Sequence, residues 1–276
     1  MALSDAPSKI DGWLLSRMRS NQNKWIEAMS DVSLREGVMI SHFEMLSDWN
    51  WYLRRGGLDR TTAMKFLEGW IPMLAPATPH IAEEFWNKFG GKDLLAALEI
   101  PTLSIESDDL HILAEEEYVK NIISSARNLL NLAERHSKKS ISRVVIQTSP
   151  IWKSDLASEA IKLHLSEFDF KANGQEHVKS LEIFNEESIR GEVFRTWNSI
   201  VVGGKKTRGK IYTWSDRSRY LLSEGIDELG IISANSDFIA SALGVEDVEA
   251  YRVGEGEDVG EKARISFPLE PGIAFL

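Results

Sequence analysis

The chain has 276 residues, of which 43% are hydrophobic, so it is long enough for two domains or one large one with a buried core. It contains no cysteine, which excludes disulfides, thiolate zinc sites and a cysteine nucleophile and suits a reducing cytoplasm. No apolar run reaches the roughly 18–20 residues that span a bilayer, and the N-terminus lacks the pattern of a signal peptide, so we expect no membrane partner. The net charge of −10, taken alone, argues against nucleic acid, because phosphate contacts need Lys and Arg.

Charge is nevertheless distributed unevenly along the chain. Residues 203–219 are basic and glycine-rich, with Asp216 as the one acid, whereas residues 220–276 are mainly acidic. The cations of the basic segment are Lys205, Lys206, Arg208, Lys210, Arg217 and Arg219. Local sign matters more than the sum when a partner touches one face. Two interpretations stay open for this segment, a solvated basic loop and a contact for a polyanion.

The N-terminal part of the chain predicts helices. Apolar residues at helical spacing predict one helix over residues 8–30 and a second over residues 31–54. The run Arg54-Arg55-Gly56-Gly57 ends the second helix, since it puts cations in the last turn and glycines just after it. A third helix is expected from Thr61 to Trp70, with Asp59 as its cap.

A proline-stiffened corner follows the third helix. We expect that helix to end near Trp70 and a fourth to run from Pro79 to Phe89, closed by Gly90-Gly91. Thr78 is the expected N-cap, its hydroxyl accepting a backbone N–H, and Trp86 is expected in the core. Four helices with short connections predict an antiparallel bundle.

The second half of the chain changes character. Pro101 and the acidic run 106–109 mark a boundary, and a long helix is expected over residues 115–136. A strand over 141–148 and then a helix over 151–165 are typical of an α/β unit. The remaining expected elements are helices over 178–184, 188–197, 216–229 and 236–243, and a closing hairpin of strands 248–253 and 263–267.

The predicted fold class is therefore a mainly α antiparallel helical bundle followed by a smaller α/β C-terminal domain. The predicted divisions are a bundle over residues 1–100, a connecting segment with a long helix over 101–138, and an α/β domain over 139–276.

The motifs that would indicate catalysis or metal binding are incomplete. His80, Glu83 and Glu84 form H-x-x-E-E, which lacks the second histidine of a zinc protease. The segment Gly203-Gly204-Lys205-Lys206-Thr207 lacks the spacing of a phosphate-binding Walker loop. There is no Gly-x-Ser-x-Gly elbow. We therefore predict no catalytic residue and no metal ligand in this chain.

One motif resembles a known family. Residues 76–86 read Pro-x-x-Pro-His-x-x-Glu-Glu-x-Trp, which resembles the signature of the anticodon-binding bundle of class Ia aminoacyl-tRNA synthetases. Residues 11–17 resemble the opening of that bundle, and residues 51–55 resemble the end of its second helix. The Pro-His pair and the tail over residues 268–276 resemble the archaeal and eukaryotic type of the leucyl-tRNA synthetase family.

The resemblance implies a C-terminal fragment. The family's His-Ile-Gly-His and Lys-Met-Ser-Lys-Ser motifs are missing, so ATP and Mg²⁺ would bind in a catalytic domain outside this sequence, and no cofactor is expected in the fragment. The parent would be an enzyme that attaches leucine to tRNA(Leu) using ATP, while the fragment would bind tRNA and be inactive alone. Its expected partners are tRNA(Leu) and the remainder of the synthetase chain. Two alternatives stay open: the equivalent fragment of a valyl or isoleucyl enzyme, and a protein-interaction module that kept the bundle.

The resemblance also implies which residues contact tRNA. Arg17, Arg54 and Arg55 would face the inner side of the tRNA. The six cations of the basic segment would follow phosphates. Pro271, Gly272 and Ile273 would form a turn whose exposed backbone groups read the long variable arm. The alternative for this tail is a structural strand of the domain.

Overall fold

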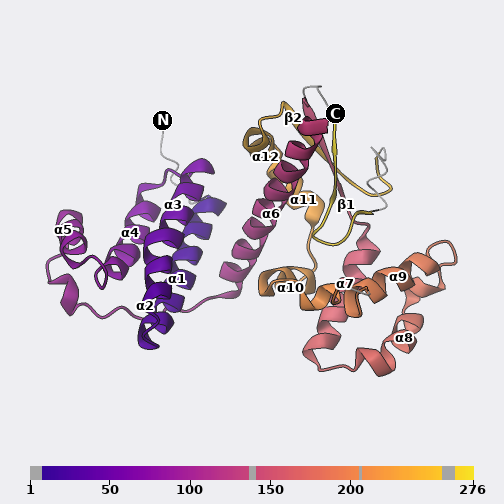
Figure 1. The fold of residues 1–276 in the computed structure, drawn as a ribbon, viewed down its shortest axis with the longest axis horizontal. Coiled ribbons are helices and arrows are strands. Elements are labelled where there is room, and N and C mark those ends of the chain that lie inside the picture. Colours follow the sequence, from indigo (N-terminus) through magenta and orange to yellow (C-terminus); the bar gives the residue numbers. More distant parts are fainter. Residues whose placement is uncertain (1–7, 137–140, 205–206, 257–264) are drawn as a thin grey trace. The chain divides into compact units, whose positions relative to one another are not determined.

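A computed structural model describes residues 8–136, 141–204, 207–256 and 265–276 (Figure 1). The chain forms two compact units, Met1–Leu113 and Ala114–Leu276. The first is helical and the second adds a small sheet to its helices, which confirms the predicted fold class. The predicted connecting segment over 101–138 is divided between the two units, because the division lies inside helix α6 (Ser107–His136). No described helix is both long and apolar enough to cross a membrane.

The first unit is a helical bundle built around the longest of its complete helices, α1. Its elements are α1 (Lys9–Ser30), α2 (Leu34–Val38), the π-helical η1 (Met39–Glu44), α3 (Met45–Arg54), α4 (Arg60–Leu74), α5 (Pro79–Phe89) and η2 (Leu95–Ala97). Helix α1 packs against α3 and α4 and buries Trp13 and Leu14. Phe66 of α4 is fully buried and lies between two tryptophans, with ring centroids 5.6 Å from Trp49 and 5.4 Å from Trp70. The large aromatic residues therefore supply much of this core.

The proline corner differs from the prediction at both of its ends. Helix α4 continues through Pro72 to Leu74, so the predicted end near Trp70 is wrong. Thr78 does not cap α5 with its side chain; its hydroxyl donates to the Leu74 carbonyl at 3.1 Å, satisfying a carbonyl at the end of α4. Pro79 does occupy the first turn of α5, as predicted.

Trp86 lies at the edge of the bundle rather than in its core. Its side chain is half-buried, and its indole N–H donates to the Asp93 carbonyl at 3.1 Å. The prediction that this ring is buried is wrong because α5 contributes only the small Ala82 to the buried cluster it shares with Ile71 and Leu95. The Trp86 ring instead stacks on Phe89, 5.9 Å away, at the rim of that cluster.

The second unit begins with the part of α6 from Ala114 onward. Its other elements are β1 (Arg143–Thr148), α7 (Ile151–Leu165), α8 (Phe170–Ser180), η3 (Glu182–Asn185), α9 (Arg190–Val201), η4 (Lys210–Tyr212), α10 (Asp216–Ser223), α11 (Glu228–Ala234), α12 (Ser236–Leu243), β2 (Asp247–Arg252) and β3 (Gly272–Phe275). Its main apolar core gathers around α7 and α9, with Trp197 and Ile161 among the least exposed side chains.

The sheet of the second unit has β1 in the middle, in the order β2-β1-β3. Strand β2 runs parallel to β1, and β3 runs antiparallel to it. Residues Val144 to Ile146 of β1 are buried on both faces of the sheet, as expected for a central strand. The predicted strand at 248–253 is confirmed, but the predicted hairpin is wrong, because β2 pairs with β1. Of the other arm, residues 263–264 lie outside the described residues, and Phe267 makes only an isolated bridge to Glu270.

A glycine divides the single helix predicted over residues 216–229. Helix α10 ends at Ser223, and Gly225 has a φ of +83°, a backbone conformation that glycine adopts readily. The next helix starts anew at Glu228, with the Asp227 carboxylate accepting from the Gly230 amide at 3.1 Å. The break separates α10 from α11 (Figure 1), and Glu228 at the start of α11 accepts from Ser149, just after β1, and from Leu269, before β3.

Candidate nucleic-acid interface

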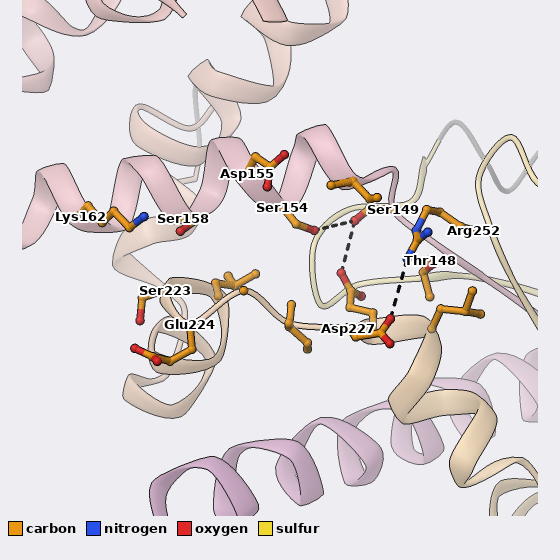
Figure 2. Close-up of a pocket in the computed structure, with 16 residues that line it drawn as sticks. Thr148, Ser149, Ser154, Asp155, Ser158, Lys162, Ser223, Glu224, Asp227 and Arg252 are labelled. Carbon is orange, nitrogen blue, oxygen red and sulfur yellow. Dashed lines mark hydrogen bonds and ion pairs between the residues drawn. The ribbon is translucent and has the colours of Figure 1, made fainter. Parts of the chain in front are cut away.

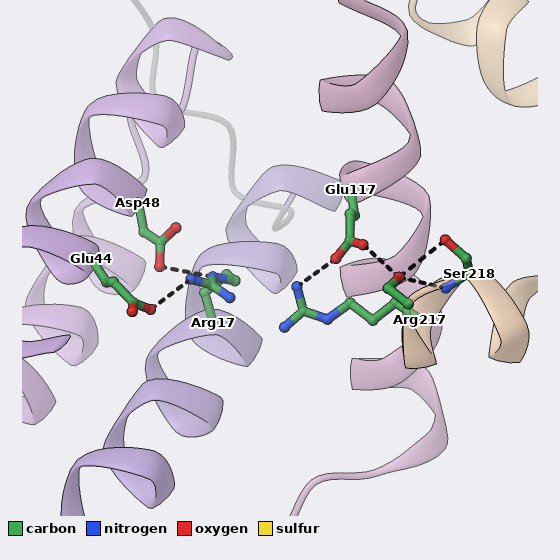
Figure 3. Close-up of polar contacts among 7 residues, drawn as sticks. Arg17, Glu44, Asp48, Glu117, Arg217 and Ser218 are labelled. Atoms are coloured by element: carbon green, nitrogen blue, oxygen red, sulfur yellow. Dashed lines mark hydrogen bonds and ion pairs between the residues drawn. The ribbon is translucent and has the colours of Figure 1, made fainter. Parts of the chain in front are cut away.

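Arg17, predicted to face tRNA, is largely enclosed within the first unit. Its side chain is 13% exposed and lies between two carboxylates of the neighbouring helices (Figure 3). The guanidinium Nε is 2.8 Å from Asp48, and a terminal nitrogen is 3.7 Å from Glu44. Asp48 also accepts from the Asn21 amide at 2.9 Å. This arginine therefore links α1 to α3, and its charge is already balanced.

Arg54 and Arg55 lie at the C-terminal end of α3, where the helix dipole favours cations. Arg54 is exposed, and its guanidinium carbon lies 5.3 Å from the centroid of the Trp51 ring. Arg55 is half-buried. Of the arginines predicted in the first unit, Arg54 is thus the one whose charge is most open to a partner.

Arg217 and Arg219 organise the start of α10. Arg217 is 3.0 Å from Glu117 of α6, and the same carboxylate accepts from the Ser215 hydroxyl at 2.9 Å (Figure 3). Arg219 is 2.5 Å from Asp216 and donates to a backbone carbonyl of η4 at 3.1 Å. Both guanidinium groups therefore hold elements of the second unit together.

The remaining cations of the basic segment differ in what surrounds them. Lys210 pairs with Glu270, and its ammonium lies 5.8 Å from the Phe267 ring, so it fastens η4 to the segment before β3. Arg208 is exposed and has no ion-pair partner among the described residues. Lys205 and Lys206 lie outside the described residues.

The tail residues predicted to read the variable arm belong to the sheet. Gly272 and Ile273 are buried in β3, opposite Gln147 and Ile146 of β1, and Pro271 is half-buried. The expected turn with exposed backbone at these positions is wrong, because the sheet uses that backbone for pairing. The chain turns before them, around Leu269, which has a φ of +63°. Whether the tail touches tRNA stays a prediction.

A polar cleft of about 550 Å³ lies at the carboxyl ends of the parallel strands β1 and β2 (Figure 2). Hydroxyl side chains contribute to its lining, among them Ser149, Ser154 and Ser158, together with carboxylates. At one side Arg252 lies 3.8 Å from Asp227. This is the edge of a parallel pair at which α/β proteins commonly place ligands.

The buried carboxylate Glu228 occupies one end of this cleft. It accepts from the Tyr118 hydroxyl at 2.7 Å, the Leu269 amide at 3.2 Å and the Ser149 hydroxyl at 3.3 Å. Burial raises the pKa of this carboxyl above its ordinary value, although these hydrogen bonds oppose the shift. The three donors come from α6, the loop before β3 and the end of β1, so Glu228 is a structural junction.

Asp155 also lines the cleft, and burial raises the pKa of its carboxyl. Among the described residues it makes no hydrogen bond to a serine of the cleft. Across the described chain no three His, Cys, Asp or Glu side chains gather as a metal-binding group. What the cleft offers is hydroxyls and paired charges.

The comparisons with known proteins extend over both units. Residues 11–146 match the family described as the anticodon-binding domain of tRNA ligase. Leucine–tRNA ligase of Methanocaldococcus jannaschii is 27% identical over 267 residues, which is 96% of this chain and 25% of the relative. That of Pyrococcus furiosus is 28% identical over 269 residues, again 96% and 25%, and that of Methanosarcina acetivorans is 27% identical over 272 residues, 98% and 27%. The chain therefore spans about a quarter of the length of these relatives.

Proposed function

We propose that this chain, whose residues 11–146 belong to the anticodon-binding domain family of tRNA ligases, is the C-terminal, tRNA-binding part of a leucine–tRNA ligase. The observation that carries the proposal is the similarity to leucine enzymes over 96% of the chain, through the bundle and the α/β unit alike. This extent favours leucine over the valine and isoleucine alternatives, since the family match by itself reaches only residue 146. The partners in this proposal are tRNA(Leu) and the rest of the ligase, in the cytoplasm.

The proposed division of labour leaves chemistry outside this chain. ATP, Mg²⁺ and leucine would bind in the part of the parent that carries the two catalytic motifs. The fragment would bind the inner face and the variable arm of the tRNA. We propose Arg54, Arg208, Lys205 and Lys206 as the direct phosphate contacts. The ion-paired Arg17, Arg217, Arg219 and Lys210 would shape the surfaces that carry them.

A second candidate function rests on an apolar stripe of the first unit. Met39, Phe43, Leu46 and Leu53 follow helical spacing along η1 and α3, and each side chain is between 44% and 59% exposed. An exposed stripe of this kind is typical of a protein-binding face. In the leading proposal it would meet the remainder of the synthetase; in the second it would be the function itself.

The proposed function is tested by titrating the whole chain with tRNA(Leu) and with the same tRNA lacking its long variable arm. We expect the affinity for the trimmed tRNA to be lower by a factor of about ten or more, and a factor of ten corresponds to about 1.4 kcal/mol. A short-armed tRNA of another amino acid is the matched control. Equal affinity for all three, or no binding, would contradict the proposal.

A further inference from the structure

A second concave site lies in the α/β unit, away from the polar cleft. It is a pocket of about 510 Å³ bordered by the start of α8, the end of α9 and η4. Its lining combines apolar groups with charge. Its lining includes Phe168, Asp169, Lys171, Val202, Arg208 and Tyr212.

The apolar part of the pocket includes exposed side chains. Tyr212 is 48% exposed and Val202 is 59% exposed, although both line the cavity. The Tyr212 ring is held edge-on by His164, with centroids 5.4 Å apart and planes at 87°. An aromatic side chain that is oriented by a neighbouring ring and about half exposed is a suitable stacking platform.

Two cations stand beside this platform. Arg208 and Lys171 are exposed, and neither has an ion-pair partner among the described residues. Just before Arg208, the Thr207 hydroxyl accepts from the Gly204 amide at 3.1 Å. A Cβ added at Gly209 would lie 2.5 Å from the Ile200 carbonyl, so the chain here is pressed against α9. This packing fixes where Arg208 leaves the backbone.

The single carboxylate of the lining, Asp169, narrows the choice of ligand. One of its oxygens caps α8 by accepting from the Lys171 and Ala172 amides at 2.9 and 3.1 Å. The negative charge of this carboxylate disfavours a phosphate deep in the pocket, but its oxygen atoms can accept an N–H from the edge of a base. A ligand with a flat aromatic group inside the pocket and an anion outside it, near Arg208, would complement the ring, the carboxylate and the cations of the lining.

We propose that this pocket receives one unpaired RNA base, stacked on Tyr212, with an adjacent phosphate at Arg208 and Lys171. A base in a helix cannot offer its face to a protein ring, so the nucleotide lies in a loop, a bulge or an end. The inference rests on the proposed function in taking that RNA to be tRNA.

The test compares variants of the whole chain in a tRNA(Leu) binding titration. Tyr212→Ala should weaken binding by about 5- to 150-fold, the range expected for one base–aromatic stack of about 1–3 kcal/mol. Tyr212→Phe keeps the ring and should bind as the unmodified chain does. Phe85→Ala removes an aromatic ring of similar exposure, 47%, from the first unit and should also leave affinity unchanged. Thermal melting checks that each variant folds.

Two further variants make the test independent of the ring deletion. Val202→Glu places a carboxylate at the pocket mouth, on a side chain that is 59% exposed, and should weaken tRNA binding while Tyr212 remains. Arg208→Ala should weaken binding and lower the salt slope by about one unit. Ultraviolet cross-linking of the complex should join an RNA nucleotide to Tyr212 or Phe168.

The failures of the two proposals differ. If the unmodified chain binds no tRNA, the proposed function itself fails. If it binds tRNA and Tyr212→Ala binds equally well, only the pocket assignment is overturned. If Tyr212→Phe and Tyr212→Ala lose the same amount of tRNA affinity, the contact is made by the Tyr212 hydroxyl, and stacking on the ring is overturned. A further outcome would assign the site to an acidic peptide instead. In it, poly-glutamate lowers tRNA binding as much as Arg208→Ala does, while Tyr212→Ala leaves tRNA binding unchanged.

Discussion

At the residue scale, Glu228 connects distant parts of the second unit through one buried carboxylate. Its donors Tyr118 and Leu269 are separated from it by 110 and 41 residues. Since burial raises the pKa of this carboxyl in the folded chain, folding favours its protonated form. The stabilising contribution is therefore complete below the ordinary value of 4.5 and is lost as pH rises through the folded pKa.

Glu228→Gln removes this titration and provides a test. We expect the free energy of unfolding of the variant to rise relative to that of the unmodified chain as pH increases from about 4 to 8, because a neutral amide has no ionisation to oppose. Urea denaturation across that pH range measures the difference. Glu224→Gln, an exposed carboxylate of the same unit, is the matched control. A difference that stays constant with pH for Glu228→Gln would show that this carboxyl is not the group that couples folding to protons.

Sequence reasoning located cations but not their counter-charges. The partner of Arg17 is 31 residues away and that of Arg217 is 100 residues away, so no local pattern shows that both are neutralised. The pocket at Tyr212 was missed for a similar reason, because α8, α9 and η4 form it together. The one local signal for it is an aromatic residue in a basic, glycine-rich segment.

At the element scale, local signals predicted the elements whose ends they control. Helix α7 was predicted with the bounds Ile151–Leu165 that the structure shows, and the Asp59 cap of α4 accepts from the Thr62 amide as expected. A structural strand was left open as the alternative for the tail, and β3 confirms it; the local pattern could not decide, because the place of β3 depends on pairing with β1 more than 120 residues earlier. The missed break at Gly225 does have a local signal, an isolated glycine inside a helical pattern.

The role of β3 in the sheet leads to a prediction about stability. Ile273 is 4% exposed and lies opposite Ile146, so Ile273→Ala should lower the free energy of unfolding by about 2–5 kcal/mol. Leu276 follows the strand and is 51% exposed, so Leu276→Ala should change it by less than about 0.5 kcal/mol. Denaturant titration of both variants measures the contrast. Equal small effects would mean that β3 is not a stable part of the sheet.

The same strand affects how the tail is tested for tRNA binding. Deleting residues 268–276 would remove β3 and with it a partner of the central strand. A loss of affinity for long-armed tRNA after this deletion would therefore not separate recognition from folding. Point variants at exposed positions, such as Leu276, separate the two effects.

At the scale of the whole molecule, the net charge of −10 opposes binding to a polyanion. Affinity for tRNA must then come from local groups of cations, and binding must release counterions from the RNA. The apolar stripe along η1 and α3 would behave differently, since an apolar protein interface depends weakly on salt. Salt dependence thus separates the two candidate functions.

The measurement that tests the central claim most directly is the affinity of the whole chain for tRNA(Leu) as a function of salt. We predict a linear fall of the logarithm of the binding constant with the logarithm of salt concentration. Changing Lys205 and Lys206 to Ala should flatten that slope by about one to two units. The control is Lys88→Ala, which should leave the slope unchanged because the Lys88 ammonium lies 2.6 Å from Glu84 and is already paired. Binding that is absent, or that does not change with salt, would contradict the assignment of this chain as a tRNA-binding part of a leucine–tRNA ligase.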